Sequence, residues 1–181
     1  MNNLTIFVEG EDDVLFFNKN ILKLFHQKGG YDEINVVKYQ ETGTKRFLQH
    51  LQFINRFDGN YIFISDFDFR PCITSKKNDR IKEFTRENFD KLDANKIFIV
   101  KNEIESWFLA GVDNNQPIFR NIDVPNDTEK TSKDYLERLL KKTKFDSRVD
   151  FFIEVSNYFN YDLAMQRNGS FRYFLEKLEL K

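Results

Sequence analysis

The chain has little cysteine, histidine, proline or glycine for its length. Its 181 residues include one cysteine, two histidines, three prolines and seven glycines. A single cysteine excludes an internal disulfide and a cysteine-based zinc site, and two histidines exclude a multi-histidine metal site. The low proline and glycine contents exclude a low-complexity chain. Any metal chemistry is therefore expected to depend on carboxylates.

The chain also lacks an excess of one charge and any long apolar run. Its 28 Lys and Arg residues balance 29 Asp and Glu residues, giving a net charge of −1. The charge balance therefore gives no sign of an acidic disordered chain, and it lacks the basic excess that is typical of many nucleic-acid-binding proteins. The first apolar run, residues 4–8, is too short for a signal peptide, and no run approaches the ~20 residues of a transmembrane helix. We expect a cytoplasmic protein, in a reducing compartment and without a membrane partner.

Apolar side chains are plentiful: hydrophobic residues make up 40% of the chain, and 21 residues are Phe. Apolar runs predict buried strands at 4–8, 34–39, 61–64 and 96–100. Helical spacing predicts helices at about 12–27, 44–54, 83–92 and 103–110, with a loop over 70–79. Strands that are apolar throughout and alternate with helices predict an α/β fold, whose parallel sheet is covered on both faces.

After residue 112 the pattern indicates helices alone. A polar stretch over 113–127 predicts a long loop, and helices are expected at about 132–142, 149–159 and 170–178. The last has Phe171, Phe174, Leu175 and Leu178 along one face, which is typical of a helix docked on a core. We therefore predict an α/β domain over 1–112 and a C-terminal helical extension over 113–181 packed on it.

Acidic residues follow three of the predicted strands. Glu9 follows the first, Asp66 and Asp68 the third, and Glu103 and Glu105 the fourth. Sites in parallel sheets form outside the carboxyl ends of the strands, so these acids share one crevice if the first and third strands are neighbours. In extended backbone, Asp66 and Asp68 point to the same side. Grouped carboxylates repel one another, and Mg²⁺ or Mn²⁺ relieves that cost while activating phosphates and water.

Each acid also has a simpler explanation. An acid at a strand end is often only a solvated loop residue. Asn102 and Glu105 have the spacing of a capping box, in which the Glu105 side chain satisfies backbone donors. Asp12 and Asp13 suit the first turn of a helix because they face its positive end. Both interpretations stay open at this point.

Two segments together resemble the TOPRIM domain of topoisomerases, primases and OLD-family nucleases: VEGEDD at 8–13 and ISDFD at 64–68. Over about residues 4–110, the resemblance implies a Rossmann-like, four-stranded, mainly parallel sheet. It implies that Glu9 is an acid/base or metal-site residue, that Asp66 and Asp68 hold Mg²⁺, and that Asp13 is a further acidic residue of the site. A third acid is missing after Asp68, which makes Glu105 a candidate metal ligand in its place.

Two shorter segments, NEIESWFL at 102–109 and RNGSFRYFL at 167–175, resemble parts of small stand-alone TOPRIM-like proteins. Such proteins accompany bacterial defence or mobile-element genes. The implied function is an OLD-like nuclease of phage defence that uses Mg²⁺ or Mn²⁺, acts on DNA or RNA, and has Glu9, Asp66 and Asp68 as catalytic residues. A non-catalytic module that binds a partner protein from the same locus is the alternative. A ribosomal-RNA-maturing TOPRIM ribonuclease ranks third, because its typical Asp-Pro-Asp-x-x-Gly segment is absent.

Phosphate backbones need cationic neighbours even on a chain of balanced charge. Lys76, Lys77 and Arg80 follow the Asp-x-Asp segment, and Lys45 is expected at a helix N-terminus, where phosphates bind. These four are our candidate phosphate-binding residues. A second basic cluster lies on the C-terminal helices: Arg138, Lys141, Lys142, Lys144 and Arg148. For either cluster, the alternative is a solvated helix face.

Overall fold

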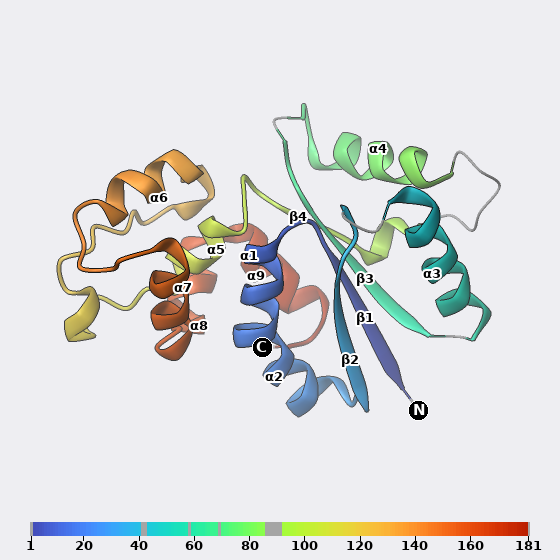
Figure 1. Cartoon of the computed structure of the whole chain (residues 1–181), viewed down its shortest axis with the longest axis horizontal. Helices are drawn as coiled ribbons and strands as arrows, with labels where there is room; N and C mark the ends of the chain where they lie inside the picture. The colour runs from blue at the N-terminus through green and yellow to red at the C-terminus, as the bar shows by residue number, and fades with distance from the viewer. Residues whose placement is uncertain (1, 41–42, 58, 69, 86–91, 181) are drawn as a thin grey trace.

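The computed structural model describes residues 2–40, 43–57, 59–68, 70–85 and 92–180. Four strands form one sheet in the order β2-β1-β3-β4: β1 (Asn3–Val8), β2 (Glu33–Lys38), β3 (Asn60–Asp66) and β4 (Ile97–Val100) (Figure 1). Every adjacent pair is parallel. The predicted α/β fold with a four-stranded parallel sheet is confirmed, and the first and third strands are neighbours.

Helices cover both faces of the sheet (Figure 1). One face is covered by α5 (Glu105–Ala110), α9 (Gly169–Lys177) and the long helical segment 11–29, which comprises α1 (Glu11–Phe16), η1 (Phe17–Ile21), α2 (Leu22–Leu24) and η2 (Phe25–Gly29). The other face carries α3 (Thr44–Arg56) and α4 (Ile73–Thr85). Along β1, Ile6 and Val8 belong to the first core and Phe7 to the second, because successive side chains of a strand alternate between faces.

The C-terminal region packs on the first of these cores. It contains α6 (Lys133–Leu140), α7 (Arg148–Asn157), α8 (Tyr161–Arg167) and α9, joined to α5 through the turns η5 (Pro117–Phe119) and η6 (Thr128–Lys130). Trp107 of α5 is fully buried among Phe171 and Phe174 of α9, and its Nε1 donates to Ser170 Oγ at 2.9 Å. One hydrophobic cluster therefore runs from β1 through α5 to α9, across residue 112.

Three local expectations differ from the structure. The loop predicted over 70–79 is wrong, because α4 begins at Ile73. Few apolar residues mark this helix, since its inward side carries Lys76, which is buried. The predicted helix over 83–92 begins within α4, but residues 86–91 lie outside the described residues. A separate helix α8 also divides the region between the predicted C-terminal helices, and η4 (Ala94–Lys96) precedes β4.

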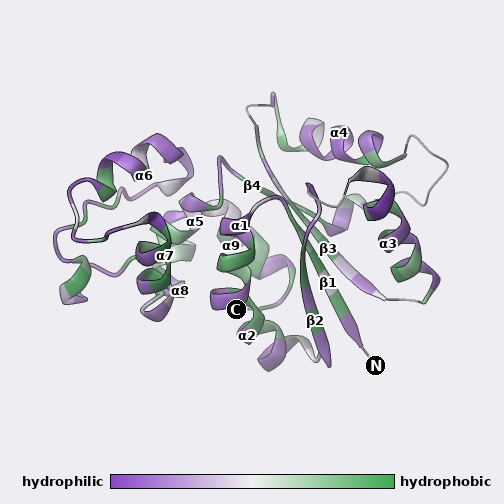
Figure 2. Ribbon diagram, viewed as in Figure 1, coloured by the Kyte–Doolittle hydropathy of each residue, from purple (hydrophilic) through white to green (hydrophobic). Residues whose placement is uncertain are grey.

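Hydropathy follows this layering. Figure 2 shows hydrophobic residues along the strands and hydrophilic ones over most of α4 and α6. Among the described residues, no helix has the length and apolar character needed to cross a bilayer.

The docking of α9 can be tested with Phe174→Ala. Phe174 is fully buried against Phe17 and Phe98, so its truncation leaves a cavity between α9 and the sheet. We expect a loss of about 3–5 kcal/mol in the free energy of unfolding, measured by urea denaturation. Phe53→Ala is the control, because Phe53 is 61% exposed, and should cost under ~1 kcal/mol. Equal losses in the two variants would contradict the docking of α9.

Candidate active site

The pairing of β1 with β3 brings Glu9 beside Ser65 and Asp66. Phe7 lies opposite Phe63 in the parallel register, so Glu9 lies level with Ser65 two residues further on. Glu9 Oε1 accepts hydrogen bonds from Ser65 Oγ at 2.7 Å and from the Asp66 backbone N–H at 3.2 Å. Strand alternation turns Glu9 and Ser65 toward the α4 side of the sheet and Asp66 toward the α1 side. The predicted convergence of Glu9 and Asp66 is therefore present.

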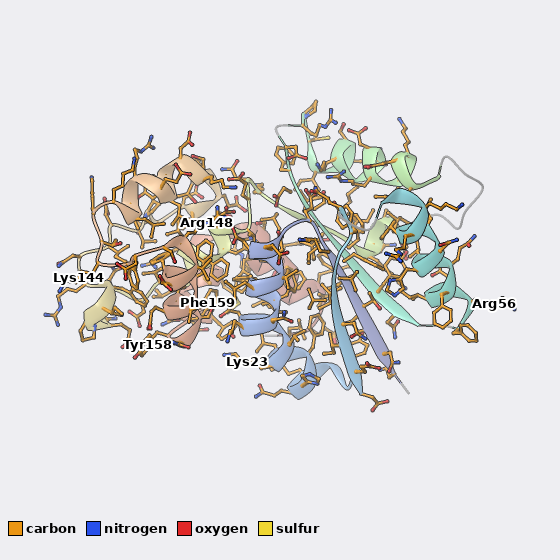
Figure 3. All side chains as sticks on the ribbon, in the orientation of Figure 1. Lys23, Arg56, Lys144, Arg148, Tyr158 and Phe159 are labelled. Carbon is orange, nitrogen blue, oxygen red and sulfur yellow. The ribbon has the colours of Figure 1, made fainter. Side chains whose placement is uncertain are left out.

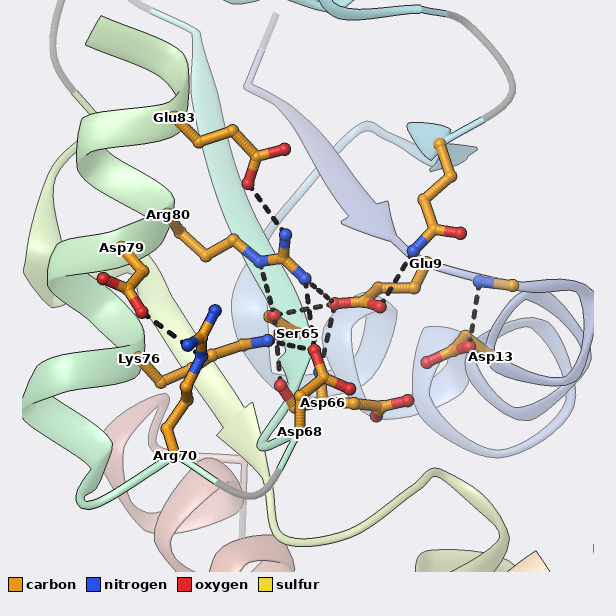
Figure 4. A network of polar contacts seen from close by, with 12 residues as sticks. Glu9, Asp13, Ser65, Asp66, Asp68, Arg70, Lys76, Asp79, Arg80 and Glu83 are labelled. Atoms are coloured by element: carbon orange, nitrogen blue, oxygen red, sulfur yellow. Dashed lines mark hydrogen bonds and ion pairs between the residues drawn. The ribbon is translucent and has the colours of Figure 1, made fainter.

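Helix α4 supplies the cations that face Glu9 (Figure 4). Arg80 Nη2 lies 2.7 Å from Glu9 Oε1, and Arg80 Nε donates to Ser65 Oγ at 2.9 Å. Lys76, whose side chain is only 3% exposed, forms an ion pair with Asp68, and Arg80 Nη2 lies 3.8 Å from the same carboxylate. Two cations spaced one helical turn apart thus balance two of the predicted catalytic acids.

Asp68 does not follow the extended geometry expected for an Asp-x-Asp pair. Strand β3 ends at Asp66, and Asp68 has a left-handed φ of 48°, which aspartate tolerates better than most residues. The premise that both side chains leave one extended strand is therefore wrong. Asp68 turns to Lys76 and is 58% exposed, whereas Asp66 faces α1.

Beside Asp66 lies a cavity of about 270 Å³, which we call the acid cleft. Three elements line it with carboxylates: the β1–α1 segment with Glu9, Asp12 and Asp13, the end of β3 with Asp66, and the β4–α5 segment with Glu103 and Glu105. Two cations from the C-terminal region, Lys133 and Arg148, complete the lining. Asp68 is on the α4 side and is not among the described residues that line the cleft.

Arg148, at the start of α7, joins the C-terminal helices to the acid cleft (Figure 3). Its guanidinium lies 2.9 Å from Asp12 Oδ2 and 3.4 Å from Glu105 Oε1. Glu105 is buried, and burial raises the pKa of its carboxyl. The capping box expected for Glu105 is wrong: the N-cap of α5 is Ile104, and the Asn102 amide donates to backbone carbonyls of residues 129 and 131.

Three acids of the cleft, Asp13, Asp66 and Glu103, form no ion pair among the described residues, and of these Asp13 and Asp66 have a buried oxygen without a hydrogen bond. Asp13 Oδ2 accepts from the Gly10 N–H at 3.0 Å, but Asp13 Oδ1 and Asp66 Oδ1 are buried and accept no hydrogen bond within the described chain. Burial, with the charge of Glu9, raises the pKa of Asp13 to about 7. Burial and then the charges of Asp13 and Glu9 raise the pKa of Asp66 to about 9. Asp66 therefore holds a proton at neutral pH.

The donor set of the acid cleft suits a hard divalent cation. Its possible ligand atoms include carboxylate oxygens, and Asp13 and Asp66 each contribute a buried oxygen without a hydrogen-bond partner in the described chain. Within the described ranges, no three Asp, Glu, His or Cys side chains are placed closely enough to form a ready-made metal site. Glu9 is held by Arg80 and Glu105 by Arg148, so either would have to leave its guanidinium to join Asp13 and Asp66 around one cation.

The candidate phosphate-binding residues divide into two groups. Lys76 and Arg80 lie at the site, as described above. Lys77 points elsewhere and donates to the Ala94 carbonyl at 2.9 Å, and Lys45 is exposed in the first turn of α3. None of the four is among the described residues lining the acid cleft, but Arg80 contacts Glu9, which does line it.

Three side chains of the site were not predicted as part of it. Ser65 links Glu9 to Arg80, and the Gln40 amide donates to Glu9 Oε2 at 3.0 Å. Arg148 was expected only in a basic cluster on the C-terminal helices. The strand register could have indicated Ser65, which lies level with Glu9. No local pattern places Arg148 beside Asp12, because the two are far apart in the sequence.

The raised pKa values make a prediction about stability and pH. Carboxyl groups of an unfolded chain titrate near 3.8, whereas those of Asp13 and Asp66 titrate near 7 and 9 in the fold. The stabilisation from the two protonated groups is complete below pH 3.8 and is lost as pH rises through about 7 and 9. Asp66→Asn stays neutral, so its free energy of unfolding relative to wild type should increase with pH, by at most about 1.4 kcal/mol per unit.

The measurement is urea denaturation of metal-free protein in EDTA between pH 5 and pH 9. Asp162→Asn, which removes an exposed carboxylate in α8, is the control and should follow the wild-type curve. A constant difference between Asp66→Asn and wild type over this range would show that Asp66 is ionised throughout.

Comparison with known proteins adds no family and no activity to this geometry. The chain matches no protein-family model, no curated protein and no solved structure.

Proposed function

We propose that the protein is a Mg²⁺- or Mn²⁺-dependent nuclease of TOPRIM type, which hydrolyses phosphodiester bonds of DNA or RNA, with a role in phage defence. One observation carries the proposal. Glu9, Asp13 and Asp66 converge on the carboxyl edge of a parallel sheet, and two of their oxygens are buried without partners in the described chain. The sequence segments around these residues are those that resemble TOPRIM nucleases.

Each side chain has a role in this proposal. Mg²⁺ or Mn²⁺, held by Asp66 and Asp13 with Glu9 or Glu105, would supply Lewis-acid activation of a phosphoryl oxygen and of water. Arg80 and Lys76 bind the phosphate oxygens, exchanging their present carboxylate partners for the substrate. Glu9, once released from Arg80, accepts the proton of the attacking water. Ser65 and Gln40 orient the Glu9 carboxylate through the hydrogen bonds described above.

One observation favours the second candidate, a non-catalytic module that binds a partner protein. The Arg80–Glu9 and Lys76–Asp68 ion pairs already balance two of the acids without a metal. In a module of this kind, the internal cations would be permanent structural partners of the carboxylates. The two candidates therefore differ in whether divalent cations bind the cleft.

Cleavage assays with Glu9→Gln and Asp66→Asn test the nuclease directly. Both changes keep the shape of the side chain but remove a carboxyl group that can ligate the metal or accept a proton, so we expect cleavage rates to fall at least ~100-fold. Labelled single-stranded and duplex DNA and RNA are incubated with each protein in Mg²⁺, Mn²⁺ or EDTA. Asp162→Asn is the matched control and should cleave at the wild-type rate.

Thermal melts with and without Mn²⁺ accompany the assay. We expect Mn²⁺ to raise the melting temperature of wild type and Asp162→Asn, but to have little effect on Asp66→Asn. Wild-type rates in Glu9→Gln and Asp66→Asn would overturn the assignment of the site. A wild-type protein that neither cleaves any substrate nor responds to Mn²⁺ would favour the non-catalytic module.

A further inference from the structure

Helix α6 connects the acid cleft to a second cavity. Its first residue, Lys133, lines the cleft. Its later turns, with the preceding segment 121–123, line a cavity of about 420 Å³ that we call the α6 groove. The groove residues that matter here are Ile122, Asp123, Tyr135, Arg138, Lys141 and Lys142.

The α6 groove is basic, and its cations differ from those of the active site. Arg138, Lys141 and Lys142 are exposed, and one carboxylate, Asp123, lies with them. Lys76, Arg80 and Arg148 all form ion pairs with carboxylates, whereas the three groove cations form none within the described ranges. The groove cations can therefore bind an anionic ligand without first breaking an ion pair.

The floor of the groove is apolar and carries one aromatic ring. Ile122 and Leu139 are buried beneath it. The half-buried Tyr135 is held in place because its hydroxyl donates to the Asp123 carbonyl at 2.8 Å. A fixed aromatic ring among unpaired cations is the combination with which proteins bind single-stranded nucleic acids, since bases stack on the ring and cations bind the backbone.

The rise of α6 gives the spacing along the helix between Lys133 of the acid cleft and the residues of the α6 groove. At 1.5 Å per residue, Tyr135 lies about 3 Å along the axis from Lys133, and the last helical residue lies about 10 Å from it. A stacked single strand advances ~3.4 Å per nucleotide, so about one to three nucleotides cover these distances. A strand with one phosphate in the acid cleft therefore reaches the α6 groove with its neighbouring nucleotides.

We infer that the α6 groove is a binding site for single-stranded nucleic acid, which holds the substrate strand within about three nucleotides of the acid cleft. This inference rests on the proposed nuclease function, because it gives the cleft a phosphodiester substrate. It adds a preference for single strands over duplexes, because Tyr135 stacks only on bases that are not already paired and stacked in a duplex.

The test compares two triple variants that each lose three exposed cations. The groove variant carries Arg138→Gln, Lys141→Gln and Lys142→Gln, and the control carries Lys19→Gln, Lys28→Gln and Arg56→Gln. Binding of a fluorescent 12-nucleotide single strand, as DNA and as RNA, is measured in EDTA over a range of salt concentrations. We expect the groove variant to bind at least ~10-fold more weakly and its salt slope to fall by about 2, with the control near wild type.

Two single variants test the stacking. Tyr135→Leu should bind the single strand several-fold more weakly than wild type, and Tyr135→Phe, which keeps the ring but loses its hydroxyl hydrogen bond, should bind it more tightly than Tyr135→Leu. Duplex binding should change less than single-strand binding in Tyr135→Leu. Equal losses in both triple variants, wild-type binding by the groove variant, or equal losses for single strand and duplex in Tyr135→Leu would each overturn the inference.

A small substrate separates this inference from the proposed function. Bis(p-nitrophenyl) phosphate offers the acid cleft a phosphodiester without a chain of nucleotides to bind the α6 groove. The groove variant should hydrolyse it at the wild-type rate with Mn²⁺ while cleaving the 12-nucleotide strand more slowly. If wild type binds the strand through the groove but hydrolyses neither substrate, the nuclease proposal fails and the groove stands. If wild type hydrolyses both substrates and the groove variant hydrolyses both at the same rates, the inference about the groove fails and the nuclease proposal stands.

Discussion

The parallel pairing of β1 with β3 is the constraint on which the rest of the site depends. It makes two strands that are distant in sequence end at the same edge, so that Glu9 lies level with Ser65 and beside Asp66. Pairing of β4 on the other side of β3 brings the β4–α5 segment and Glu105 to that edge as well. Side-chain alternation then divides the acids between the two faces, with Glu9 toward α4 and Asp66 toward α1.

The carboxylates gathered at this edge of the sheet would destabilise the fold if neither cations nor protons balanced their charge. Arg80 balances Glu9, Lys76 balances Asp68, and Arg148 lies against Asp12 and Glu105. These cations come from α4 and α7, so both the helices over one sheet face and the C-terminal region contribute to the same site. Asp66 is left with a proton rather than a cation, because burial raises its pKa to about 9. In the proposed nuclease, a divalent cation would replace this proton.

The sheet and its acidic edge could be predicted from the sequence. Strands that are apolar throughout indicate burial on both faces of the sheet, and Glu9 and Asp66 directly follow two such apolar runs. Other features had no local signal. Residues 73–79 of α4 were expected as a loop, since the inward side of the helix carries Lys76 and Arg80 for the site before its apolar residues Ile81 and Phe84. The spacing of Asp68 from Asp66 does not predict the left-handed backbone at Asp68. Arg148 reaches the cleft only through the packing of α7 on α1 and α5, which residue periodicity cannot specify.

A crystal structure of the protein soaked in Mn²⁺, with the anomalous signal used to place the ion, tests the central claim most directly. The account predicts an anomalous peak at coordination distance from carboxylate oxygens of Asp66 and Asp13, with Glu9 or Glu105 turned away from its guanidinium to join them. The opposite result is a cleft without a peak, in which Arg80 remains on Glu9 and Arg148 on Glu105 at saturating Mn²⁺. That result would show that the internal cations are permanent partners of the acids and that the edge of the sheet is not a metal site.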